Sequence, residues 1–326
     1  MKSHKIFLLG VLFSCATFAP SLHAKTETVW ANGVTEKGGW FDNNKSWNGD
    51  SMLCWAAAAS NIIEYWQAKA DPSKIPAGTP ANGNVFNKFK ETFKDKGLGA
   101  NIAWAWYFGG AVLTDYNYLY DFKDTANAKN TGQYWEKYVE KCGLSSTEKG
   151  AFPKYMTAAS ATNNLSAPGP NGEYATFGAT NFAQNIVDQL KSGAGITLTL
   201  KIAGYGNGHE ITLWGIETET QKKVDSDALD LVAKAIWVTD SDDYYSGLKK
   251  VSLTYQTNTI DVKGEKEGDP TYSYEETKIL YDGNEILYWS ALNLPYAVPE
   301  PSAFGFVAGL FSLALAASRR RRSRKS

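Results

Sequence analysis

The chain has 326 residues, of which 33 are basic and 34 acidic, so its formal net charge at pH 7 is −1. It contains three cysteines and three histidines, and two of those histidines lie in the first 24 residues. Because a zinc finger needs four Cys/His ligands, the composition excludes that class once a leader is removed. No internal repeat, coiled coil or long low-complexity linker interrupts the chain.

Residues 1–24 have the pattern of a secretory leader. Two lysines precede an apolar stretch over residues 6–18, and the small residue Ala24 marks a cleavage position. Cys15 lies in a short sequence that weakly resembles a lipoprotein cleavage site, but the bulky Phe13 and the continuing apolar run favour ordinary cleavage near Ala24. We therefore expect the mature protein to be exported.

Residues 299–326 form a second targeting pattern. A Pro-Glu-Pro segment precedes an apolar run, Ala303 to Ala317, and a cluster of arginines that begins at Arg319. As a helix, these fifteen apolar residues span about 22 Å, less than the ~30 Å hydrocarbon core of a bilayer. The order of the three parts resembles the PEP-CTERM sorting signals that exosortases process in Gram-negative bacteria. We expect transient membrane association through this helix and a final location in the cell envelope or outside the cell, with an uncleaved tail anchor as the alternative.

Residues 25–298 form one predicted domain, which is long enough to bury a substantial core. Removing the two ends takes away eight of the 33 basic residues and one of the 34 acidic residues, which leaves a net charge of −8. An acidic domain argues against nucleic acid as a partner. Of the cysteines and histidines, only Cys54, Cys142 and His209 remain, so any Cys/His chemistry depends on a single imidazole.

The spacing of apolar residues predicts four helices in the first part of this domain. They cover Met52–Gln67, Val85–Lys94, Tyr134–Cys142 and Asn181–Lys191. Residues 158–180 are rich in Asn, Ala, Pro and Gly, and we expect them to form a surface loop.

From Ile196 to Leu294 the pattern changes to that of strands, with six segments rich in β-branched and aromatic residues. Helices therefore come first and an antiparallel sheet second, an order that predicts an α+β fold. We expect an N-terminal helical lobe to pack on a C-terminal antiparallel β-sheet lobe, with a groove where the two layers meet.

Cys54 stands at the start of the first predicted helix, in the sequence NGDSMLCWAAAAS. Unpaired backbone N–H groups and the positive end of the helix dipole favour a thiolate over a thiol at such a position. Two other interpretations remain open at this point. Cys54 can be an inert buried thiol, or it can form a disulfide with Cys142, the other cysteine of the exported chain.

His209 follows three glycines in GYGNGHEITLWG, an arrangement that can display an imidazole beside a groove. Asp240 and Asp242 end a later strand, and their spacing of two places both carboxylates on one face. One of them can accept the imidazole N–H, so that Cys54, His209 and Asp240 can serve as nucleophile, base and orienting acid. A histidine satisfied in a turn, a solvated acidic turn and a calcium loop are the alternatives. The EF-hand pattern fails, because Tyr245 stands where it needs glycine.

Four stretches of the sequence are similar to one known family. They are TVWANGVTEKGGWFD (residues 28–42), KSWNGDSMLCWAAAASNIIEYW (45–66), GHEITLWGIE (208–217) and IWVTDSDDYYSGLKKVSL (236–253). They resemble the papain-superfamily endopeptidases of the IdeS/Mac type, secreted streptococcal enzymes that cut immunoglobulin G in its hinge region. The likeness covers roughly residues 28–294, with little that aligns between 70 and 180.

The resemblance implies a papain-like fold with the active site in the cleft between the lobes, and it assigns roles to five residues. Cys54 matches the nucleophile, His209 the base and Asp240 the residue that orients the imidazole. Lys45 matches a lysine that helps to stabilise the oxyanion, and Asp242 matches an aspartate that supports it. One residue fewer than in the family pattern separates Lys45 from Cys54. From the sequence alone, Lys45 would be an ordinary exposed lysine.

These inferences predict a secreted, envelope-sorted cysteine endopeptidase that acts on an extracellular protein and needs no metal or organic cofactor. Immunoglobulin and mucosal glycoproteins are the candidate substrates, and an exosortase-type enzyme is the expected processing partner. An inactive surface-binding protein and an acyl transferase with the same triad are the alternatives. Six aromatic residues are candidates for a substrate groove, although core packing is the more common role of such residues. The six are Trp104, Trp106, Tyr107, Tyr116, Tyr118 and Tyr120.

Overall fold

The computed structural model of the chain describes residues 25–70, 72, 75, 77–81, 83–109, 122–124, 132, 134, 156–161, 167–168, 174–175, 179–202, 208–222, 229–242, 247–262 and 272–294. The predicted leader and the predicted sorting signal lie outside this part of the chain, as does Cys142. Within the ranges given, no helix has both the length and the apolar character needed to cross a membrane.

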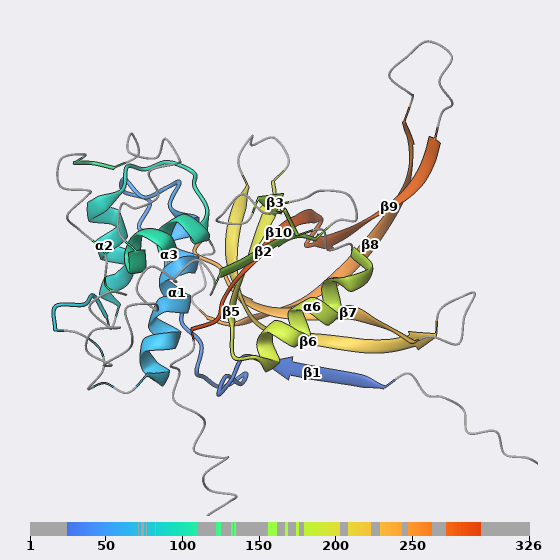
Figure 1. Ribbon diagram of the computed structural model, residues 1–326, viewed down its shortest axis with the longest axis horizontal. Helices are drawn as coiled ribbons and strands as arrows, with labels where there is room; N and C mark the ends of the chain where they lie inside the picture. The colour runs from blue at the N-terminus through green and yellow to red at the C-terminus, as the bar shows by residue number, and fades with distance from the viewer. Residues whose placement is uncertain are drawn as a thin grey trace, which may run out of the picture.

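Six antiparallel strands close into a β-barrel, which is the main element of the fold (Figure 1). They follow one another in the order β6, β5, β10, β9, β8 and β7, and the pairing of β6 with β7 closes the ring. Their bounds are β5 Gly195–Lys201, β6 His209–Lys222, β7 Leu229–Thr239, β8 Lys249–Val262, β9 Tyr272–Tyr281 and β10 Asn284–Leu292.

Two further strands extend the barrel sheet. β1, Thr26–Trp30, pairs antiparallel with β6, and β2, Met156–Ser160, pairs antiparallel with β10. A separate two-stranded sheet joins β3, Ala167–Pro168, to β4, Tyr174–Ala175.

Four helices occur in the described part of the chain: α1 Cys54–Lys69, α2 Asn84–Thr92, α3 Ala100–Gly109 and α6 Ala179–Lys191. α1 contacts α2 and α3 as well as the strands β5 and β6. In Figure 1, α1, α2 and α3 lie together beside the barrel, whereas α6 lies across the barrel strands. α1 is therefore the helix that connects α2 and α3 to the barrel, whereas α6 contacts the barrel strands itself.

The sequence of α1 explains how it fits between two layers. Every residue from Cys54 to Gln67 is buried, and the run Ala56–Ala59 has side chains small enough for a close approach of the neighbouring elements. A Cβ atom on Gly195 of β5 would lie 2.5 Å from Ile62 Cγ2, so the first residue of β5 must be a glycine where α1 packs on it.

The predicted fold class is wrong. We expected an α+β, papain-like arrangement with a helical lobe on an antiparallel sheet lobe, but the described chain is mostly β, with a closed six-stranded barrel and two extra strands. The reason lies in β6, which is 14 residues long and pairs with both β5 and β7. Its register with β7 shifts at two places, Leu213/Gly215 and Glu217/Thr218, and such irregularities bend a sheet so that it can close.

Three of the four predicted helices are confirmed to within a few residues, as α1, α2 and α6. The fourth, Tyr134–Cys142, lies almost entirely outside the described residues. The loop predicted over residues 158–180 contains the end of β2, the strands β3 and β4 and the start of α6. α3 was not predicted. Its sequence ANIAWAWYFG has no polar face, so apolar and polar residues do not alternate with the period of a helix.

Three of the aromatic residues that were candidates for a groove belong to the core instead. Trp104, Trp106 and Tyr107 of α3 are at most 1% exposed, which confirms the alternative of core packing for them. The other three, Tyr116, Tyr118 and Tyr120, lie outside the described residues.

An aromatic cluster anchors the amino end of α1. The ring of Trp55 packs edge-on against Phe93 at 5.2 Å between centroids, and Phe93 in turn packs against Trp106 of α3. Trp55 Nε1 also donates a hydrogen bond of 2.8 Å to the carbonyl oxygen of Lys96. These contacts fix the helical turn that begins with Cys54.

Candidate active site

Cys54 is the first residue of α1, and its side chain is buried at the wall of a cleft. No side chain of the described residues caps this end of the helix, where Leu53 occupies the N-cap position. The first backbone N–H groups of the helix and the positive end of its dipole are therefore directed at the region of the thiol. Cys54 is a free cysteine, so the alternative in which it forms a disulfide is wrong.

The pairing of β6 with β7 brings His209 and Asp240 together. His209 is the first residue of β6, and Asp240 follows the last residue of β7. Because Thr212 lies opposite Thr239 in this antiparallel pair, the start of β6 lies beside the end of β7. His209 Nε2 lies 2.6 Å from Asp240 Oδ1, a hydrogen bond in which the imidazole donates to the carboxylate. The structure thus brings together the imidazole and the carboxylate that the sequence paired.

The carboxylate of Asp240 is itself held in place. Its Oδ1 atom also accepts a hydrogen bond of 2.9 Å from the backbone N–H of Asp242. Burial alone would raise the pKa of Asp240, but the hydrogen bond from His209 and the charge of the imidazolium lower the pKa below its ordinary value. Asp240 therefore remains an anionic acceptor for the ring.

The other imidazole nitrogen of His209 faces the reacting region. Because Asp240 engages Nε2, Nδ1 is the nitrogen that remains for the thiol of Cys54, and it also lies 3.6 Å from Asp242 Oδ2. Burial by itself would lower the pKa of His209. The hydrogen bonds with Asp240 and Cys54, and the negative charges of both groups, nevertheless raise that pKa to about 10. These contacts favour an imidazolium beside Cys54 at neutral pH.

Lys45 is buried in the same cleft, so the expectation of an ordinary exposed lysine is wrong. Its side chain is 2% exposed, and Nζ lies 2.5 Å from Asp242 Oδ1. Nζ also donates to the carbonyl oxygen of Ser51 at 2.6 Å, and it lies 4.3 Å from the ring centroid of Trp47. All five residues that the sequence singled out are thus brought together, with Asp242 between the lysine and the imidazole.

Asp95 is a residue of the site that sequence reasoning missed. Its Oδ2 atom accepts hydrogen bonds from Ser51 N at 3.1 Å and Ser51 Oγ at 2.8 Å, and its Oδ1 atom accepts one from Met52 N at 2.6 Å. Asp95 thereby holds the two residues that lead into α1, including the carbonyl group that receives the Lys45 ammonium. No local signal could have found it, because it stands in an irregular segment after α2.

A buried polar network, also missed, connects α1 to the strands that carry the imidazole and the carboxylate. Asn61 Nδ2 donates to Thr212 Oγ1 at 3.0 Å and to Thr239 Oγ1 at 3.4 Å, while its Oδ1 accepts from the backbone N–H of Asn43 at 2.8 Å. Thr239 Oγ1 donates in turn to the carbonyl oxygen of Phe41. A polar residue inside an apolar helical stretch was the available signal for Asn61.

Glu210 follows His209 in β6, and its carboxyl group is buried. Oε1 accepts a hydrogen bond of 2.7 Å from Thr197 Oγ1, and Oε2 accepts one of 2.9 Å from the backbone N–H of Ala100, the first residue of α3. Burial raises the pKa of Glu210 to about 7 against the opposing effect of both hydrogen bonds. Glu210 thus links β5 and β6 to the helix that packs on α1.

The cleft has a volume of about 480 Å³, and four of the five predicted residues line it, namely Lys45, Cys54, His209 and Asp242. Asp240 does not line the cleft and contacts it through the imidazole of His209 and the backbone N–H of Asp242. The volume is in the range of sites that hold small ligands or one side chain of a peptide with its flanking backbone.

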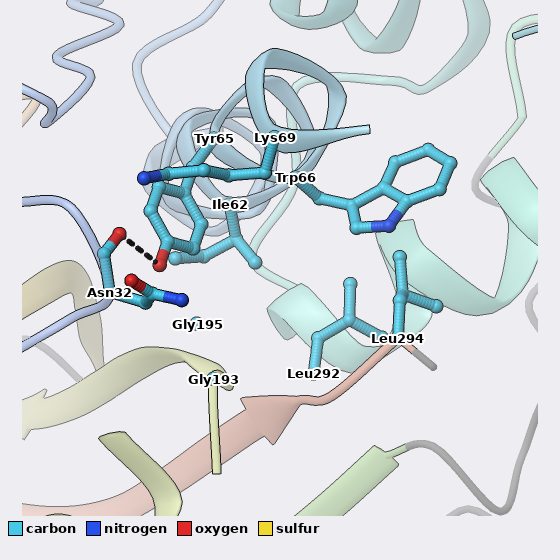
Figure 2. A pocket seen from close by; sticks show the side chains of 9 residues that line it. All are labelled: Asn32, Ile62, Tyr65, Trp66, Lys69, Gly193, Gly195, Leu292 and Leu294. Carbon is cyan, nitrogen blue, oxygen red and sulfur yellow. Dashed lines mark hydrogen bonds between the residues drawn. The ribbon is translucent and has the colours of Figure 1, made fainter. Parts of the chain in front are cut away.

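A second cavity lies at the other half of α1 and has different properties. Figure 2 shows it between Ile62 and Trp66 on the helix and Leu292 and Leu294 at the end of β10, with the hydroxyl of Tyr65 donating to the carbonyl oxygen of Asn32 at 2.8 Å. Its volume is about 30 Å³, enough for a water molecule but not for an organic ligand.

Three residues at or next to the cleft carry donor atoms that a metal ion could use. Ligand atoms of His209, Asp240 and Asp242 lie within 4.8 Å of one another, and one imidazole with two carboxylates is a known set for divalent transition metals. A cation there would have to displace the Lys45 ammonium from Asp242 and the imidazole N–H from Asp240. The existing ionic contacts therefore favour an acid–base site over a metal centre.

No family model matches the chain, and no curated protein matches it.

Proposed function

We propose that the chain is an exported cysteine endopeptidase of the IdeS/Mac type that hydrolyses peptide bonds of an extracellular protein. One observation carries the proposal: His209, the single imidazole of the predicted mature chain, lies between Asp240 and Cys54. The thiol and the imidazole also line one cleft together with the ammonium of Lys45. Such a set is what an activated thiolate nucleophile requires.

In the first half-reaction, the Cys54 thiolate attacks the carbonyl carbon of the scissile bond, forming a C–S bond as the C–N bond breaks. The proton on His209 Nδ1 passes to the leaving amine. Asp240 holds the Nε2 side of the ring at 2.6 Å, so the ring cannot rotate and Nδ1 stays directed at the cleft.

The oxyanion formed during this attack needs donors from the protein. The backbone N–H of Cys54 at the helix start is one, and the Lys45 ammonium is the other. An ammonium has three N–H donors, and among the described residues Ser51 and Asp242 engage two of those of Lys45, so the third can meet the oxyanion.

In the second half-reaction, His209 Nδ1 takes a proton from water, and the resulting hydroxide attacks the thioester. The C–S bond breaks, the thiolate–imidazolium pair of Cys54 and His209 is restored, and the carboxylic acid product leaves and releases its proton to the solvent. The same proposal includes export through the leader, sorting by an exosortase-type enzyme, and immunoglobulin or a mucosal glycoprotein as the substrate.

Alkylation tests the reactive pair directly. Iodoacetamide should modify Cys54 in the native protein, and the rate should fall at least tenfold in a folded His209→Ala variant, because the thiolate loses its counter-charge. Peptide mapping locates the modified cysteine, and Cys54→Ala is the matched control. An unreactive Cys54 in the folded protein would favour the inactive surface-binding protein instead.

Cleavage is tested by incubating the protein with serum and mucosal proteins and sequencing the new amino termini, with Cys54→Ala in parallel. We expect termini that the variant does not produce and that form equally well with a chelator present. Activity that needs a divalent metal and survives Cys54→Ala would contradict the proposal. If added amines react with the acyl-enzyme faster than water does, the protein is an acyl transferase and not a peptidase.

A further inference from the structure

Trp47 combines two properties that are unfavourable for folding. Its side chain is 56% exposed, and Tyr255, at 40%, is the one other large hydrophobic residue exposed in the described part of the chain. Its backbone φ is 60°, in the left-handed region that bulky residues rarely adopt. A residue that is both strained and exposed does not serve the core, and such positions cluster at sites of function.

The loop around Trp47 holds the indole in a defined place. Asp50 Oδ2 accepts hydrogen bonds from Ser46 N at 2.9 Å and Ser46 Oγ at 2.8 Å, and the Asp50 side chain is 1% exposed. One face of the indole lies over the Lys45 ammonium, 4.3 Å from the ring centroid. The loop backbone and the contact with Lys45 therefore place the ring at the wall of the cleft before a ligand binds, which reduces the entropy lost on binding.

Apart from Lys45, Cys54, His209 and Asp242, the described residues that line the cleft carry no ionisable side chain. Met52 and Ile202 line it with Trp47, and Gly97 and Gly208 add no side-chain bulk. The charged groups of the cleft are already paired, Lys45 with Asp242 and the imidazole with Asp240. Among the described lining residues, a charged ligand side chain would find no counter-charge that is not already paired, whereas an apolar group would bury surface against three apolar side chains.

We infer that Trp47, Met52 and Ile202 form a subsite that binds a bulky apolar side chain of the polypeptide substrate, next to the scissile bond. This inference rests on the proposed function. It makes Trp47 a residue that determines specificity rather than one that takes part in bond cleavage.

Cleavage of a proteome-derived peptide library tests the subsite. We expect apolar residues to be enriched at one fixed position beside the cleaved bond in the wild type and in Trp47→Phe, which keeps a ring. Trp47→Gly should lose that enrichment, with KM about tenfold higher for apolar peptides but not for glycine-flanked peptides, which serve as the internal reference. Glycine is the suitable replacement, because it adopts a φ of 60° without strain and so preserves the loop.

Binding without cleavage separates this inference from the proposed function. Cys54→Ala protein should bind a leucine-flanked peptide about tenfold more tightly than its glycine-flanked counterpart, and Trp47→Gly should abolish the difference. Cleavage with no positional preference, or a preference kept in Trp47→Gly, would overturn the subsite and leave the peptidase in place. Selective binding without any cleavage would overturn the peptidase, and the absence of both would overturn the two together.

Discussion

Lys45 Nζ lies 2.5 Å from Asp242 Oδ1 in an ion pair whose lysine side chain is almost fully buried. The second carboxylate oxygen of Asp242 lies 3.6 Å from His209 Nδ1. The ammonium also donates to the carbonyl oxygen of Ser51, just before α1. The pair therefore connects the loop that precedes the thiol with the turn that follows β7, and it holds a positive charge at the cleft.

Replacing Lys45 with methionine should lower kcat about a hundredfold with little change in KM, because a single oxyanion donor contributes about 3 kcal/mol to the transition state. The protein should still fold, with a lower melting temperature. Steady-state kinetics on a cleaved peptide and thermal unfolding measure the two effects. A loss of kcat below threefold would show that the ammonium does not meet the oxyanion.

The double variant Lys45→Met/Asp242→Asn separates stability from catalysis. It removes the carboxylate that the single variant leaves without its counter-charge, so the melting temperature should recover while kcat stays low. Lys250→Met is the matched surface control, since Lys250 pairs with Glu217 at 2.7 Å but is 47% exposed. Exposed pairs contribute about 0–1 kcal/mol, so neither kcat nor stability should change measurably.

Asp95 should act as a positioning residue. In Asp95→Ala, the N–H groups of Ser51 and Met52 lose their acceptor, so the free energy of unfolding should fall by about 1–3 kcal/mol. Because the carbonyl group that receives Lys45 also loses its support, we expect kcat to fall about tenfold while KM is kept. Kinetics and urea unfolding measure both effects.

Two comparisons show whether Asp95 acts through geometry. Asp95→Asn keeps one acceptor oxygen and should fall between the wild type and Asp95→Ala in kcat, whereas Asp188→Ala on α6, which removes an exposed contact with Gln184, should change nothing. The pH profile of Cys54 alkylation should keep its midpoint in Asp95→Ala. A shifted midpoint would mean that Asp95 acts on the charge of the thiol instead.

The reacting groups were predictable because each carries a local signal. A cysteine at the start of an apolar helical pattern, a histidine at the start of a strand and two aspartates at the end of another can all be read within a few residues. His209 and Asp240 approach each other because β6 pairs with β7, the next strand of the antiparallel sheet, and Cys54 reaches them because α1 packs on β6. The sequence alone could thus indicate Cys54, His209 and Asp240 as parts of one site.

The barrel and the burial of Lys45 depend on contacts between distant segments. Closure follows from β6 pairing on both of its edges, and a strand pattern alone does not show how many partners a strand has. Lys45 is buried because Asp242 and Ser51 receive its ammonium, and Asp95 supports the latter from 44 residues away. The spacing of residues in the sequence does not indicate contacts between distant segments. The closure of the barrel and the burial of Lys45 could therefore be found only from the structure.

The raised pKa of His209 predicts a loss of stability at alkaline pH. Its pKa is about 10 in the folded protein against an ordinary value of 6.5, so the folded state binds the proton more tightly. This contribution is fully present below pH 6.5 and is lost as the pH rises toward 10. The free energy of unfolding should decline over that range in the wild type and decline less in His209→Gln; parallel profiles would contradict the shift.

Removing one partner of the imidazole tests the physical cause of that shift. In Cys54→Ala the ring loses a hydrogen-bond partner and a negative charge but keeps Asp240. Its pKa, followed by NMR of the ring protons, should therefore be lower than in the wild type. Asp240→Asn should lower the pKa further in the same background, and an unchanged pKa in Cys54→Ala would show that the thiol does not contact the ring.

Glu210 predicts a second pH effect, in a lower window. Burial raises its pKa from 4.5 to about 7, so the folded state binds this proton more tightly than the unfolded chain does. The resulting stability is fully present below about pH 4.5 and is lost as the pH rises through 7.

Relative to the wild type, Glu210→Gln should therefore become more stable across this range, by up to about 3 kcal/mol, because its amide never ionises and can still accept from Thr197. Urea unfolding at intervals between pH 4 and 8 measures the difference, with Glu217→Gln, whose side chain is 24% exposed, as control. A constant difference between the two proteins would mean that the carboxyl group of Glu210 is already ionised at pH 5.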